Sequence, residues 1–222
     1  MNTQSLNRTY TATRELQINK VVRNTYLLLG MNLITSALAA GVAMTTGARP
    51  LPWLLVMAVF IGMPFLINAM RNSAWALPLT FLFTGFMGYT LGPVLTYYLG
   101  LPGGNQIVLS AFATTAVLFV GLSAYAMVTR RDFSFMGGFL FVGLIVVLLA
   151  IVANIFLQIP ALSLTISAAS VILMSGMILY DTSRMIHEGE ANYIMITVSL
   201  FADLYVMFVH LLNLFAAFTG ED

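Results

Sequence analysis

The sequence predicts an all-α membrane protein with seven transmembrane helices. Of its 222 residues, 60% are hydrophobic and only 8% are charged, whereas a typical soluble domain has about 25% charged residues. The apolar residues form long runs, and a helix needs about 20 of them to cross a bilayer. Strands of a membrane barrel would alternate and be about half as long.

Seven runs are long enough to cross. Short connections with proline and glycine turn signals separate them, such as Pro50 and Pro52 before the second run. The runs cover residues 25–47, 51–70, 74–99, 107–129, 135–157, 161–186 and 193–219.

The polar segment 1–23 is predicted to be a cytosolic tail, followed by a membrane domain over residues 24–222. We expect the first helix to stay uncleaved because no clear cleavage site follows it. Only Arg49 lies on the far side of the predicted membrane, so the positive-inside rule places the N-terminus in the cytosol and, with seven helices, the C-terminus outside. The other basic residues share the side of the N-terminus: Arg8, Arg14, Lys20, Arg23, Arg71, Arg130, Arg131 and Arg184.

Charge and composition exclude several functions. A net charge of +1 argues against nucleic acid as a partner. The chain has no cysteine, which excludes disulfides, thiolate metal sites and thiol catalysis. We expect no cofactor, no firm metal site and no enzymatic activity.

Asp181 and Asp203 are the most informative residues, because each interrupts an apolar run. A carboxylate at membrane depth indicates a functional site. Asp181 precedes Asn192 by 11 residues and Asp203 follows it by 11. If the chain turns near 187–192, both lie roughly 10–15 Å from that turn. Two carboxyls in contact would share a proton, which makes a pH-sensitive latch, and they could contact Ca²⁺ transiently.

The polar residues of the last two runs fall on one face of each helix. Such faces must contact protein or water, so we expect them to face each other. On the sixth run they are Ser163, Ser167, Ser170 and Asp181; on the seventh they are Ser199, Asp203, His210 and Asn213. Ser199, His210 and Asn213 are either structural residues or a polar relay.

Simpler roles remain open for these charges. Asp181 and Arg184 are three residues apart and could form a local ion pair, while Asp203 could be a structural hydrogen-bonding residue. Arg71, at the cytosolic end of the second run, is either an anchor at the membrane surface or a partner that swings onto the aspartates.

The third run contains Gly85, Gly88 and Gly92, followed by Pro93. Small residues at this spacing allow close helix approach, and proline removes a backbone hydrogen bond. The run therefore predicts either tight helix packing or a hinge.

An intramembrane aspartyl protease is a remote alternative, since it also carries one aspartate on each of two adjacent helices. Tyr180 and Asp181 resemble its first motif. Its second motif is Gly-x-Gly-Asp, and the residues before Asp203 are Leu, Phe and Ala. Without those glycines, a peptide backbone would have little access.

Three runs carry a family resemblance: GFMGYTLGP at 85–93, ILYDTSRMI at 178–186 and NYIMITVSLFADLY at 192–205. With them, the chain resembles the Bax inhibitor (transmembrane Bax inhibitor motif) family. VVRNTYLLL at 21–29 and ANIFLQIPA at 153–161 are similar to its proteobacterial, YccA-like branch. The resemblance implies two three-helix layers around a central seventh helix.

The resemblance also implies two functions. The YccA-like branch is associated with the bacterial inner-membrane AAA protease FtsH and its regulators, as substrate and modulator. Members of another branch are pH-dependent Ca²⁺ leaks, whose paired aspartates match Asp181 and Asp203 and whose arginine matches Arg71. We therefore expect an FtsH modulator in a bacterial inner membrane, in contact with lipid. A proton-gated Ca²⁺ leak is the alternative.

Overall fold

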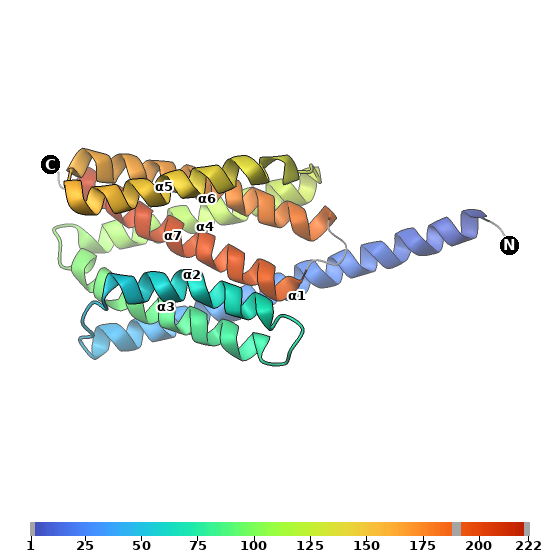
Figure 1. The fold of residues 1–222 in the computed structure, drawn as a ribbon, viewed down its shortest axis with the longest axis horizontal. Helices are drawn as coiled ribbons and strands as arrows, with labels where there is room; N and C mark the ends of the chain where they lie inside the picture. Colours follow the sequence, from blue (N-terminus) through green and yellow to red (C-terminus); the bar gives the residue numbers. More distant parts are fainter. Residues whose placement is uncertain (1–2, 188–191, 220–222) are drawn as a thin grey trace.

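The computed structural model describes residues 3–187 and 192–219, with side chains from residue 18 onward. Its described part is all-helical, with seven α-helices and one 3₁₀ turn and no strand, as predicted (Figure 1). The α-helices are α1 (Thr3–Thr45), α2 (Trp53–Ala69), α3 (Ala76–Leu99), α4 (Gly104–Thr129), α5 (Gly137–Leu157), α6 (Pro160–His187) and α7 (Tyr193–Thr219), and the 3₁₀ turn is η1 (Ser134–Met136).

Six of these helices are long and apolar enough to cross a membrane. The remaining one, α2, has 17 residues, at the lower limit of about 17–25 for a spanning helix. It is shorter than the predicted run 51–70 because Pro52 has an extended backbone, with ψ at 128°, so that the helix begins at Trp53.

Helix α1 is longer than predicted. It runs without a break from Thr3 to Thr45, so the expected boundary between residues 23 and 24 lies inside one helix. The part of α1 from Ile18 to Thr45 is apolar enough to span a membrane. Residues 3–17 therefore form a helical extension that projects from the bundle (Figure 1).

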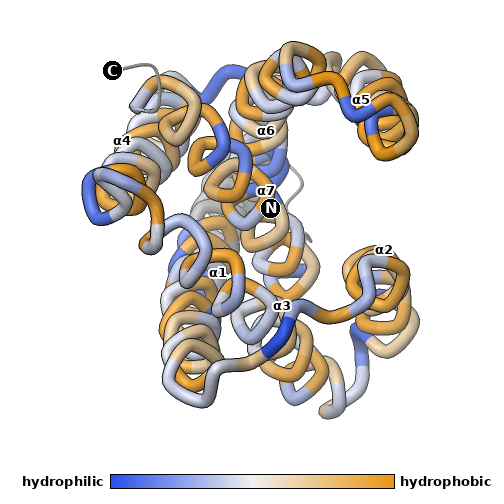
Figure 2. Tube along the Cα trace, turned by 90° about the vertical axis from the view of Figure 1, so that its left-hand side faces the viewer, coloured by the Kyte–Doolittle hydropathy of each residue, from blue (hydrophilic) through white to orange (hydrophobic). Residues whose placement is uncertain are grey.

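Helix α7 lies among the others. It packs against α1, α2, α3, α4 and α6, and its spanning stretch is the most buried of the six. Helix α5 lies at the outside of the bundle, against α6 and η1 (Figure 2). Most of its apolar side chains are exposed. The arrangement of two three-helix layers stays a prediction.

The glycines of α3 lie at its contact with α1. A Cβ atom on Gly88 would overlap the carbonyl oxygen of Ser36 and lie 2.6 Å from its Cα. A Cβ on Gly92 would overlap the Cβ of Ala43, whereas one on Gly85 would make an ordinary contact of 3.7 Å with Thr35. Helix α3 continues through Pro93. Close packing therefore requires glycine at two of the three positions.

We predict that Gly88→Ala destabilises the protein by about 1–3 kcal/mol, because the added methyl group forces α1 and α3 apart. Gly85→Ala is the matched control on the same helix. It should be neutral or slightly stabilising, since alanine has the higher helix propensity. Thermal unfolding of the purified variants in detergent measures both, and equal stability of the two variants would contradict this account of the α1–α3 contact.

Candidate functional site

Asp181 on α6 and Asp203 on α7 both lie inside the protein. Their side chains belong to residues that are only 1% and 4% exposed. The two helices that carry them pack against each other. The structure thus brings together the two acids that the sequence places on neighbouring helices.

The two aspartates are not equally far from the ends of their helices, although each is 11 residues from Asn192 in the sequence. Helix α6 continues to His187, six residues beyond Asp181, whereas α7 begins at Tyr193, ten residues before Asp203. At 1.5 Å per residue, the aspartates lie roughly 9 Å and 15 Å from those helix ends. Most of the predicted turn, residues 188–191, lies outside the described residues. The ends of the two helices are therefore staggered rather than level.

Asp181 also has the local cationic neighbour that the sequence suggested. Arg184 Nη1 lies 3.9 Å from Asp181 Oδ1, one turn along α6. The Arg184 guanidinium carbon lies 5.7 Å from the centre of the Tyr180 ring. Because the Arg184 side chain is 37% exposed, solvent screens this ion pair. The ion pair and the aspartate pair therefore coexist at Asp181.

Arg71 lies just beyond the end of α2. Its Nη1 is 3.5 Å from Asn68 Oδ1, and its carbonyl oxygen accepts a hydrogen bond of 3.3 Å from Asn192 Nδ2, at the start of α7. Within the described residues it forms no ion pair with either aspartate. Its backbone is thus near the start of α7, and a swing of its side chain onto the pair stays a prediction.

The polar faces of α6 and α7 meet further along the two helices. Asn213 Nδ2 donates hydrogen bonds to Ser167 Oγ at 2.9 Å and to Ser163 Oγ at 3.2 Å. His210 Nδ1 lies 3.0 Å from Ser167 Oγ. Ser170 instead donates to the carbonyl of Ile166 on its own helix. His210 and Asn213 therefore share one serine.

Ser199 takes no part in this cluster. It is partly buried, near the start of α7. His210 is seven residues beyond Asp203, so about 10 Å of helix separates the aspartates from the serine cluster. The relay through Ser199, His210 and Asn213 stays a prediction.

Several polar contacts were not expected from the sequence. Tyr205 Oη is 2.9 Å from Thr90 Oγ1 and joins α7 to α3, and Thr197 donates to the carbonyl of Thr25 at 3.3 Å and joins α7 to α1. Ser123 on α4 lies 3.5 Å from Thr182, next to Asp181. In the sequence, a single hydroxyl residue within an apolar run can indicate such a hydrogen bond between helices. Its hydrogen-bond partner can be identified only when the neighbouring helices are known.

Comparisons with known proteins identify the family of this chain. Residues 18–220 match the family model described as "Inhibitor of apoptosis-promoting Bax1". An uncharacterized protein of Pseudomonas aeruginosa is 49% identical over 93% of this chain and 93% of its own. The Vibrio cholerae relative, an "uncharacterized membrane protein", is 41% identical over the whole of both chains. The Escherichia coli K12 protein named "Modulator of FtsH protease YccA" is 46% identical over 93% of this chain and 94% of its own. The chain belongs to the Bax inhibitor family of membrane proteins.

Proposed function

We propose that this protein modulates a membrane AAA protease of the FtsH type by direct contact. The observation that carries the proposal is the 46% identity, over nearly the full length of both chains, with a protein named as a modulator of that protease. The proposal includes that the chain is itself a substrate of the protease and is not an enzyme.

The same proposal sets the protein's place in the cell. A second Escherichia coli relative, also 46% identical, is named an inner membrane protein. We place this chain in a bacterial inner membrane, with its N-terminus in the cytosol and its C-terminus outside. In this arrangement α2 crosses the membrane as the seventh span, and α1–α3 and α4–α6 form two layers around α7.

The helical extension of α1 supplies a means of contact. Residues 3–17 precede the spanning stretch and belong to the same unbroken helix. Helix α1 packs against α3 and α7 inside the bundle. A protease that grips the extension would therefore pull directly on the core of the protein, and the strength of that core would resist the pull.

A proton-gated Ca²⁺ leak is the second candidate function. The observation that favours it is the pair of buried carboxyls on α6 and α7, two helices that pack against each other. Carboxylate oxygens are ligands that suit Ca²⁺ as a permeant ion, and a proton shared by the pair would control their charge. Arg184, which contacts Asp181, is better placed than Arg71 to act as the gating cation.

Deleting residues 2–17 should abolish modulation while the spanning stretch from Ile18 remains. In proteoliposomes containing the protease and a membrane-protein substrate, the intact chain should slow substrate degradation. The truncated chain should return degradation to its rate without the chain. Ser175→Ala, with the extension intact, is the control and should still restrain the protease, because this serine donates to the carbonyl of Val171 on its own helix.

Two results would count against this account. Full restraint by the truncated chain would show that the extension is not the point of contact. An intact chain that leaves degradation unchanged would overturn the proposed function itself.

For the second function, liposomes containing the protein should show a Ca²⁺ flux that depends on pH. Asp181→Asn and Asp203→Asn should each remove that pH dependence, because neither leaves two carboxyls to share a proton. Ser175→Ala is the matched control: this serine lies on α6 and donates only to the carbonyl of Val171 on its own helix. If the pH dependence of the Ca²⁺ flux is unchanged in both aspartate variants, the latch is ruled out.

A further inference from the structure

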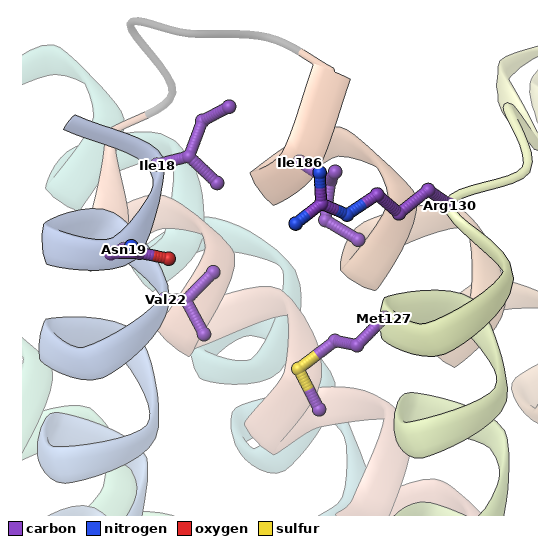
Figure 3. Close-up of a pocket in the computed structure, with 6 residues that line it drawn as sticks. All are labelled: Ile18, Asn19, Val22, Met127, Arg130 and Ile186. Carbon is purple, nitrogen blue, oxygen red and sulfur yellow. The ribbon is translucent and has the colours of Figure 1, made fainter. Parts of the chain in front are cut away.

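A pocket of about 200 Å³ opens between α1, α4 and α6, at the end of the bundle from which the α1 extension leaves. Three elements contribute to its wall, and Figure 3 shows their side chains converging on one space. The lining residues are Ile18, Asn19, Val22, Met127, Arg130 and Ile186.

The pocket combines apolar walls with one positive charge. Four of the six lining side chains are apolar, Asn19 supplies an amide, and Arg130 is the only charged residue. The Arg130 side chain reaches from the end of α4 across the pocket toward Ile186 (Figure 3). Its guanidinium forms no ion pair within the described residues. A guanidinium over an apolar surface favours an anion that carries apolar groups.

The backbone of Arg130 is fixed where α4 ends. This residue has a φ of 49°, in the left-handed region. Its N–H donates to the carbonyl of Ala126 at 3.0 Å, and its own carbonyl lies 3.1 Å from His187 Nε2, at the end of α6. Contacts with α4 and α6 therefore fix the backbone position from which the Arg130 side chain extends.

The pocket lies at the depth of the membrane surface. On α1, the basic residues Lys20 and Arg23 adjoin the lining residues Asn19 and Val22, and the spanning helices α4 and α6 end at Thr129 and His187. One turn further along α1, the rings of Tyr26 and Phe119 meet with centroids 5.9 Å apart and join α1 to α4. The pocket thus lies on the outer side of this contact, at the level of the lipid headgroups.

We propose that this pocket binds one anionic phospholipid of the surrounding membrane. The phosphate lies against the Arg130 guanidinium and the Asn19 amide. The glycerol and the first carbons of the acyl chains pack on the walls formed by Val22, Met127 and Ile186. Basic pockets between transmembrane helices recognise anionic headgroups in this way, and the apolar walls favour a lipid over a free phosphate ion.

The bound lipid would join α1 to α4 and α6. The described residues include no close backbone contact between α1 and α4. Their side chains meet deeper in the bundle, at Tyr26 and Phe119, whereas a bound lipid would join the two helices at the level of the pocket. The lipid would therefore brace the inner end of the α1 extension against the rest of the bundle.

The test uses the purified full-length protein in detergent, with added phosphatidylglycerol, phosphatidylcholine or inorganic phosphate. Native mass spectrometry measures the bound lipid, and thermal unfolding measures the stabilisation. Phosphatidylglycerol alone should bind and raise the unfolding temperature. Arg130→Gln should weaken its binding about tenfold, the loss expected for one charge-assisted hydrogen bond.

Two further variants make the test specific. Arg131→Gln removes the same charge one residue away, outside the pocket, and should bind like the natural protein. Met127→Trp fills the pocket without changing charge and should lose binding. Equal binding by Arg130→Gln, equal binding of phosphatidylcholine, or the same stabilisation by inorganic phosphate would each overturn the proposal.

Discussion

Two carboxyl groups inside a membrane protein can lie side by side only if they carry less than two full charges between them. In a medium of low dielectric constant, the repulsion of two bare carboxylates is expensive, and they have little water to solvate them. Asp181 and Asp203 are almost completely buried, on two helices that pack against each other. In the proposed latch, one proton held between them would turn the repulsion into a hydrogen bond and make the contact of α6 with α7 favourable.

The rest of the bundle depends on that contact, because α7 is surrounded by its neighbours. Helix α7 packs on α1, α2, α3, α4 and α6, and it is bonded to three of them through Thr197, Tyr205 and Asn213. A change of charge at the aspartate pair would therefore alter the packing of α7 against α1, the helix that carries the extension. The two proposed functions both depend on α7, because a pull on α1 and a proton on the aspartate pair would each act on its packing.

Most of the fold could be predicted because a membrane requires long apolar runs. The run 193–219 matches α7, Tyr193–Thr219, to the residue. The extension of α1 was not predicted, because residues 3–17 lack the apolar run on which the prediction relied. The aspartate pair followed from counting along two helices, although the helix ends are staggered. The pocket at Arg130 could not be predicted, since its lining comes from three helices and depends on which of them are neighbours.

Infrared difference spectroscopy of the protein in lipid bilayers tests the central claim most directly. At neutral pH, the account predicts a carbonyl stretching band of a protonated carboxylic acid. This band should be lost or shifted in frequency in both Asp181→Asn and Asp203→Asn, because either substitution removes one of the two carboxyls that share the proton. A spectrum without that band, or a band that neither substitution changes, would contradict the account.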